Sequence, residues 1–151
     1  MQSNTLPFCC RLYEFQLESG NYFLHEHPAC ASSWKLPCVR RVLAMAGVEA
    51  GVGHMCRHGM EQADNDGPGL VRKPTRFMTN AGEVLKGVAA KCGGGHRHIP
   101  LEGSGRCNKA RIFPEGLCHA ICRGLRKQVV KDTASGLQDR ERERSLRLSR
   151  G

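Results

Sequence analysis

The segment Asn21-Tyr22-Phe23-Leu24-His25-Glu26-His27-Pro28 decides how the rest of the sequence is interpreted. Its apolar run Tyr22-Phe23-Leu24 is typical of a strand, and the carboxylate of Glu26 stands where that strand ends before Pro28. A carboxylate at a strand end is characteristic of parallel sheets, which bind ligands in a cleft at their carboxyl edge. The same residues also fit an ordinary strand that ends in a solvated turn.

The composition predicts one modest globular domain with a polyanionic partner. The chain has 151 residues, of which 40% are hydrophobic and 25% charged. It contains no apolar run of about 18 residues and no visible signal peptide, so we expect no membrane contact and an intracellular location, cytoplasmic or nuclear. The net charge of +9 favours a polyanionic partner, which binds through its phosphate backbone as nucleic acid does.

Hydrophobic periodicity predicts an alternation of helices and strands. Helices are expected at 8–17, 34–45, 81–91 and 114–131, and strands at 21–26, 48–55 and 76–79. The glycine-rich segment 61–70 is expected to be a loop, and 93–111 to be irregular. This α/β order lacks the glycine-rich turn that opens a dinucleotide-binding fold. It therefore indicates the C-terminal half of a doubly wound, Rossmann-like fold with an incomplete sheet.

Three regions follow from this pattern. Residues 1–7 are expected to be a disordered N-terminus, and residues 8–131 the partial α/β domain. Residues 132–151 carry alternating Arg and Glu side chains and are expected to form a basic tail, either disordered or a frayed helix.

A second block, Lys73-Pro74-Thr75-Arg76-Phe77-Met78-Thr79-Asn80, supplies a likeness to a known family. Together with Phe23–Pro28 and Met55–Met60, it resembles the back half of carbon-5 cytosine DNA methyltransferases. More narrowly, the run from Phe8 to Lys127 resembles a methyltransferase-like segment of copia-type retrotransposon polyproteins of dinoflagellates and related algae. This narrower resemblance is carried by Phe23–Pro28, Ser32–Pro37, Lys73–Asn80, Gly95–His98 and Gly124–Gln128.

The resemblance implies a methyltransferase-like fold and a set of site residues. Glu26 matches the catalytic carboxylate, which activates a flipped cytosine by hydrogen bonding. His27 stands where the family usually has Asn. The nucleic acid that the resemblance implies is DNA, and the residues implied to contact it are Lys73, Arg76, Thr79 and Asn80.

The resemblance also implies that the chain is a fragment. The complete domain uses S-adenosylmethionine, whose binding motifs would lie in an N-terminal half of the same polyprotein. The nucleophilic Cys of the family follows a Pro on an earlier loop, but the Pro-Cys pair of this chain, Pro37-Cys38, follows the acid strand. We therefore expect no cofactor in this chain, no catalysis by the chain alone, and nucleic-acid binding at most.

The nine cysteines of the sequence allow a second interpretation. Most are expected to be buried thiols, including Cys118 and Cys122 on the last helix. Two thiols and two imidazoles nevertheless gather in a glycine-rich loop and could bind zinc, namely Cys92, His96, His98 and Cys107. Further soft ligands are His25, His27, Cys30, Cys56 and His58. The alternatives to the methyltransferase-like fragment are thus a small zinc-stabilised nucleic-acid-binding module, or a degenerate reading frame without function.

Overall fold

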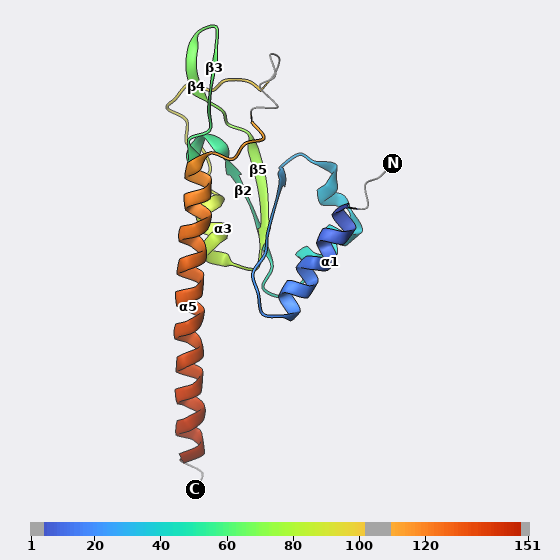
Figure 1. Cartoon of the computed structure of the whole chain (residues 1–151), viewed down its shortest axis with the longest axis vertical. Helices are drawn as coiled ribbons and strands as arrows, with labels where there is room; N and C mark the ends of the chain where they lie inside the picture. The colour runs from blue at the N-terminus through green and yellow to red at the C-terminus, as the bar shows by residue number, and fades with distance from the viewer. Residues whose placement is uncertain (1–4, 102–109, 149–151) are drawn as a thin grey trace.

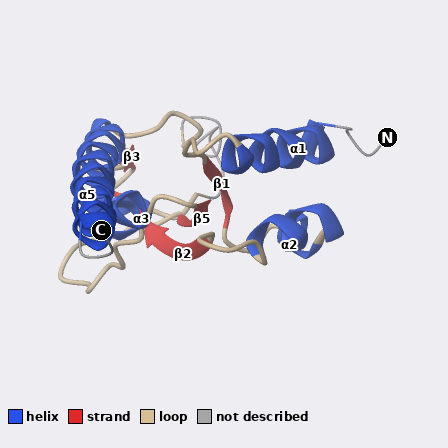
Figure 2. Ribbon diagram, turned by 90° about the horizontal axis from the view of Figure 1, so that it is seen from below, coloured by secondary structure: helices blue, strands red, loops and turns tan. Residues whose placement is uncertain are grey.

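The computed structural model describes residues 5–101 and 110–148, and its fold is mixed α/β (Figure 1). A three-stranded sheet lies between two helical layers, with α1 and α2 on one side and α3 and α5 on the other (Figure 2). The elements in chain order are α1 (Thr5–Glu18), β1 (Leu24–Pro28), the 3-10 helix η1 (Ser32–Lys35), α2 (Pro37–Leu43), β2 (Glu49–His54), the 3-10 helix η2 (Met55–His58), β3 (Glu61–Asp64), β4 (Gly67–Leu70), β5 (Pro74–Thr79), α3 (Gly82–Val88) and α5 (Glu115–Leu148).

The three-stranded sheet has the order β1-β5-β2, and both neighbouring pairs are antiparallel. β1 and β2 therefore run in the same direction, with β5 between them. The sequence predicts parallel neighbours, and this prediction is wrong for these strands. The reason lies in the connection, because β2 leads to β5 through a short hairpin and not through the helical crossover that a parallel neighbour requires.

The segment 61–70 is this hairpin, formed by β3 and β4, although the sequence predicts a loop there. The turn is built by local chemistry. The backbone N–H of Asp66 donates to Oδ1 of Asp64 at 3.0 Å, and Gly67 adopts the left-handed φ of 101° that a residue with a Cβ rarely accepts. The polar, glycine-rich composition therefore specifies a tight turn between two short strands.

The other elements lie close to their predicted ranges, with three differences. The first helix begins at Thr5, inside the segment 1–7 that is predicted to be disordered. The predicted helix 34–45 divides into η1 and α2, because Pro37 fits only at the first helical position. α5 continues past residue 131 to Leu148. Residues 1–4 and 149–151 lie outside the described part of the chain.

β5 separates two hydrophobic cores. Its neighbouring side chains Phe77 and Met78 point to opposite faces of the sheet, and both are fully buried. Phe77 packs with Met55, Val71, Val84, Val88 and Leu117 beneath α3 and α5. Met78 packs with Cys10, Phe23, Trp34, Val39 and Val42 beneath α1 and α2.

α5 contacts the rest of the molecule in its first half, as far as Asp132, whose carboxylate accepts a hydrogen bond from the hydroxyl of Tyr22. Leu117 is buried, whereas Leu125 and Val129 are 41% and 47% exposed. Cys118 and Cys122 are also exposed, not in the core. The partner helix α3 has only seven residues and cannot cover a helix of 34 residues (Figure 1).

The contact between α3 and α5 depends on a glycine. A Cβ at Gly124 would lie 2.6 Å from the Cα of Val84, so the two backbones approach as closely as a missing side chain permits. Next to this contact, Oε1 of the buried Gln128 accepts a 2.9 Å hydrogen bond from the backbone N–H of Glu83 at the start of α3.

Gly124→Ala should therefore destabilise the protein by about 1–3 kcal/mol through overpacking. Gly136→Ala is the matched control, because no atom lies within 4 Å of a Cβ there and Ala favours a helix by up to about 1 kcal/mol. Urea unfolding followed by circular dichroism measures both effects. Equal stability of the two variants would contradict this packing of α5 on α3.

His25 is a buried titratable group of β1. Its Nδ1 lies 3.0 Å from the hydroxyl of Tyr13, and its ring meets Trp34 edge-on at a centroid distance of 5.1 Å. Burial, with a smaller contribution from His27, lowers the pKa of His25 to about 4. The ring is therefore neutral at pH 7.

Acid should destabilise the fold through His25. Because its pKa is about 6.5 when unfolded and about 4 when folded, its contribution to stability is complete above pH 6.5 and is lost as the pH falls from 6.5 through 4. His25→Gln should reduce the loss of unfolding free energy between pH 7 and pH 5 by about 2 kcal/mol. His119→Gln is the control, since that side chain is 60% exposed. An unchanged pH dependence in His25→Gln would contradict the assignment.

Candidate metal centre

Four side chains that can bind a metal meet at one end of the sheet. Cys56 comes from η2, directly after β2, and Cys92, His96 and His98 come from the loop after α3. The ligand atoms of these four residues all lie within 4.8 Å of one another. We call this group the Cys/His cluster.

The spacing within the Cys/His cluster fits a tetrahedral ion. With Zn–S of about 2.3 Å and Zn–N of about 2.0–2.1 Å, the edges of the tetrahedron are about 3.3 Å between nitrogens and about 3.6 Å between nitrogen and sulfur. The Nε2 atoms of His96 and His98 are 3.0 Å apart. The Sγ of Cys92 lies 3.4 Å from the first and 3.6 Å from the second. These three atoms thus already have nearly the separations that zinc requires.

The turn between Cys92 and His96 is made by glycines. Gly94 and Gly95 have left-handed φ values of 86° and 80°, which let the chain reverse within a few residues. The reversal also brings the backbone N–H of Gly94 to 3.3 Å from the Sγ of Cys92, to which it donates. Such a hydrogen bond stabilises a thiolate, which is the form of cysteine that binds metals.

The hairpin β3–β4 fixes the position of the two histidines. Arg97, which stands between them, pairs with Asp64 and donates to the carbonyl oxygens of Gly67 and Pro68 at 3.2 and 3.3 Å. The backbone beside it joins β4, since the N–H of Leu70 donates to the carbonyl of Arg97 at 3.2 Å. The hairpin therefore acts as the support of the metal-binding loop.

Cys56 is the fourth member of the Cys/His cluster and the only one that lies outside the loop 92–98. Its side chain is buried, at 5% exposure, and burial together with a hydrogen bond to Cys92 raises its pKa. Without a cation the thiol is therefore protonated at neutral pH, and a divalent metal would displace that proton. His58, two residues later, is directed elsewhere, because its Nε2 lies 3.1 Å from the carbonyl oxygen of Val88.

The sequence predicts three of these four ligands. Cys92, His96 and His98 do come together, whereas the predicted Cys107 lies outside the described residues. Cys56 is recognisable in the sequence only as one more soft ligand, and the packing of β2 against α3 brings it to the loop.

The remaining sulfur and imidazole ligands do not form a second group in the described part of the chain. His27 lies 2.7 Å from the hydroxyl of Ser33 through its Nδ1, and Cys30 is exposed. The eight cysteines in the described ranges are free thiols, and only Cys10 and Cys56 are buried, so the expectation of mainly buried thiols is wrong.

The residues implied by the methyltransferase resemblance are spread over the sheet. Glu26 lies opposite Phe77 in the β1–β5 register, and Arg76 lies opposite His27. Because successive strand residues alternate between faces, Glu26 and Arg76 stand on opposite sides of the sheet. Lys73 lies before β5 and donates from its Nζ to the carbonyl of Ala110 at 2.7 Å.

Thr79 and Asn80 hold the start of β1. Oγ1 of Thr79 donates to the carbonyl of Phe23, while Oδ1 of Asn80 accepts from the N–H of Phe23 at 3.0 Å. Nδ2 of Asn80 donates to the carbonyl of Asn21 at 2.9 Å. Their polar atoms therefore already bind the chain itself.

No family model, curated protein or solved structure matches this chain. Among the helices in the described ranges, none has both the length and the apolar character needed to cross a membrane.

The identity of the fourth ligand can be tested directly. Cys56→Ser should weaken zinc binding by more than about 100-fold, since even the loss of a residue that only supports a ligand costs about 10–100-fold. Cys107→Ser should keep the parent affinity, because four protein ligands complete a structural site. Competition with a chromophoric chelator measures both affinities, and the opposite result would make Cys107 the ligand.

Proposed function

We propose that this chain is a small zinc-stabilised module that binds nucleic acid. The observation that carries the proposal is the Cys/His cluster, in which two thiols and two imidazoles from separate segments converge. This convergence favours the module over a reading frame without function, because four soft ligands from two separate segments meet at separations close to those of a tetrahedral zinc site.

The ligand set favours zinc over other common cations. Calcium and magnesium prefer oxygen ligands, and the Cys/His cluster contains none. Two thiolates and two imidazoles in a tetrahedral arrangement are typical of zinc. Four protein ligands leave no open position for a substrate, so the ion would be structural and not catalytic.

A bound ion would join segments that are distant in the sequence. Cys56 follows β2. The loop 92–98 follows α3 and forms backbone hydrogen bonds with the β3–β4 hairpin. In a small domain, zinc binding of this kind contributes directly to the free energy of folding.

The charge of the surface supports nucleic acid as the partner. The net charge is +9, and in the described part of the chain the Lys and Arg residues that form ion pairs are Arg41, Lys86, Arg97 and Lys131. The other cations there can release counterions from a phosphate backbone on binding.

A place in a retroelement methyltransferase-like polyprotein stays a prediction from sequence resemblance. Base activation by Glu26 would need Lys73 or Arg76 in the same cleft. Arg76 stands on the other face of the sheet, and Nζ of Lys73 donates to the carbonyl of Ala110. S-adenosylmethionine and the N-terminal half belong, under this hypothesis, to the longer polyprotein. We therefore assign no methyl-transfer step to this chain.

The metal part of the proposal is tested by titration of the metal-free chain with zinc and with cobalt(II). We expect one ion per chain, and with cobalt the visible absorption of a tetrahedral site with thiolate ligands. A chelator should lower both the helical circular dichroism and the unfolding temperature, because metal binding is coupled to folding.

The matched pair for this experiment is Cys92→Ser and Cys30→Ser. The first removes a ligand of the Cys/His cluster and should abolish the cobalt absorption, whereas the second changes an exposed thiol and should preserve it. Folding that is indifferent to zinc and to the chelator would refute the metal-stabilised module.

A further inference from the structure

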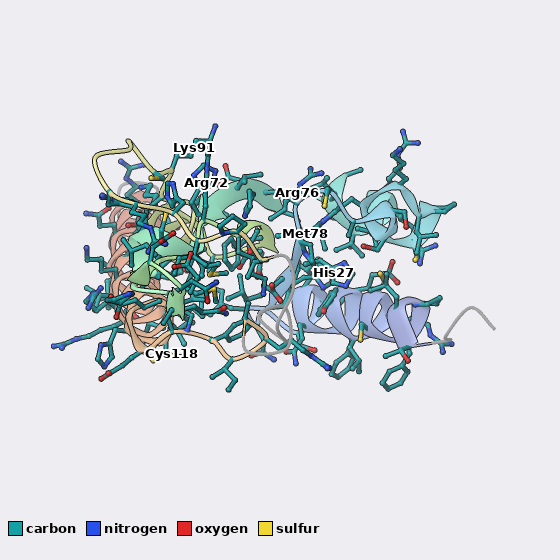
Figure 3. The ribbon with its side chains drawn as sticks, turned by 90° about the horizontal axis from the view of Figure 1, so that it is seen from above. His27, Arg72, Arg76, Met78, Lys91 and Cys118 are labelled. Atoms are coloured by element: carbon teal, nitrogen blue, oxygen red, sulfur yellow. The ribbon has the colours of Figure 1, made fainter. Side chains whose placement is uncertain are left out.

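Three cations lie on the side of the sheet that carries His54, a buried histidine next to the Cys/His cluster. Arg72 precedes β5, Arg76 lies within it, and Lys91 immediately precedes Cys92. Figure 3 shows Arg72, Arg76 and Lys91 along one edge of the molecule, with Cys118 of α5 on the opposite edge. We call these three residues the basic edge.

His54 connects the basic edge to the metal-binding loop. Its Nδ1 accepts one hydrogen bond from the backbone N–H of Cys92 at 3.0 Å and another from Nε of Arg72 at 3.4 Å. The ring of His54 therefore joins the backbone of the metal-binding loop to the side chain of Arg72.

Arg76 belongs to the same side of the sheet. It pairs with Val52 in the β2–β5 register, and Val52 and His54 are two residues apart on β2, so they share a face. The guanidinium of Arg76 lies 4.8 Å from the ring centroid of Trp34, and this contact holds the side chain without neutralising it.

No carboxylate of the described residues forms an ion pair with any member of the basic edge. Glu26, the nearest acid along β1, stands on the other face of the sheet. Arg72 and Lys91 are exposed, and Arg76 is half-buried. Three cations that lie on one side without counterions form a site for an anion with several charges, such as a run of phosphodiesters.

We propose that the basic edge binds the phosphate backbone of a nucleic acid, and that the metal in the Cys/His cluster keeps this surface in shape. The inference rests on the proposed function and adds to it the surface and the dependence on the metal. The dependence arises because Lys91 adjoins one ligand, Cys92, and His54 lies two residues before another, Cys56.

The described part of α5 offers a competing basic surface. Arg123, Arg126, Lys127 and Lys131 line a cavity of about 560 Å³ together with Glu83. Hydrogen bonding to Lys86 and the charge of Lys131 lower the pKa of Glu83, so the carboxylate is ionised and opposes a phosphate in that cavity.

The test compares two triple variants that each remove three positive charges. Arg72→Gln/Arg76→Gln/Lys91→Gln removes the basic edge, and Arg123→Gln/Arg126→Gln/Lys127→Gln removes the α5 surface. Binding to a fluorescent single-stranded DNA and to its duplex is measured by anisotropy, with zinc present, at several salt concentrations. The double variant Arg72→Gln/Lys91→Gln keeps the Arg76–Trp34 contact. It replaces the first triple variant if circular dichroism shows that the triple variant is unfolded.

The basic-edge variant should lose at least about tenfold in affinity, and its slope of log K against log salt should fall by about 2–3. The α5 variant should stay within about twofold of the parent, and a chelator should weaken the parent as much as the basic-edge substitutions do. Equal losses in both variants, or a larger loss in the α5 variant, would overturn the inference. A parent chain that binds neither DNA would instead refute the nucleic-acid part of the proposed function.

Discussion

The fold depends on the burial of β5 on both of its faces. Phe77 and Met78 are neighbours in the chain, yet each is the centre of a different hydrophobic core. A central strand of this kind requires a helical layer on each side and a hydrogen-bonded strand on each edge. The other elements satisfy these four requirements, with α1 and α2 on one side, α3 and α5 on the other, and β1 and β2 at the edges.

This arrangement also explains why the metal-binding residues lie where they do. Near His54 the sheet ends, and the chain forms η2, the β3–β4 hairpin and the loop 92–98 there. These segments and their ends contribute buried apolar side chains such as Val71 and Ile99, and polar contacts hold them as well. Arg97 with Asp64, His54 with Cys92, and the Cys/His cluster supply three such contacts within a short distance of one another.

Most of the local structure could be predicted from the sequence, because it depends on local chemistry. The apolar spacing of α3, the first-turn position of Pro37 and the strand character of Phe77–Thr79 are all visible in short windows. Strand direction could not be predicted in this way, since it is set by how β2 and β5 are connected. The fourth ligand could not be predicted for the same reason, because Cys56 reaches the loop only through tertiary packing.

The role of a polar side chain was also hard to predict from the sequence. In a linear motif Asn80 is interpreted as a nucleic-acid contact. In the structure its side-chain amide forms hydrogen bonds with the backbone of Phe23 and Asn21 before β1. A short polar motif does not reveal whether its hydrogen bonds are made within the chain or kept for a ligand, and only the fold distinguishes the two.

The length of α5 has a consequence for the behaviour of the molecule in solution. A helix of 34 residues is about 51 Å long, well over the dimension that a compact domain of this size would have. Much of it extends past the sheet as a rod, as Figure 1 shows. The protein should therefore tumble and diffuse as an elongated particle, with a larger frictional ratio than its mass of 16.6 kDa implies for a sphere. Its elution from a sizing column would accordingly overstate its mass even when it is a monomer.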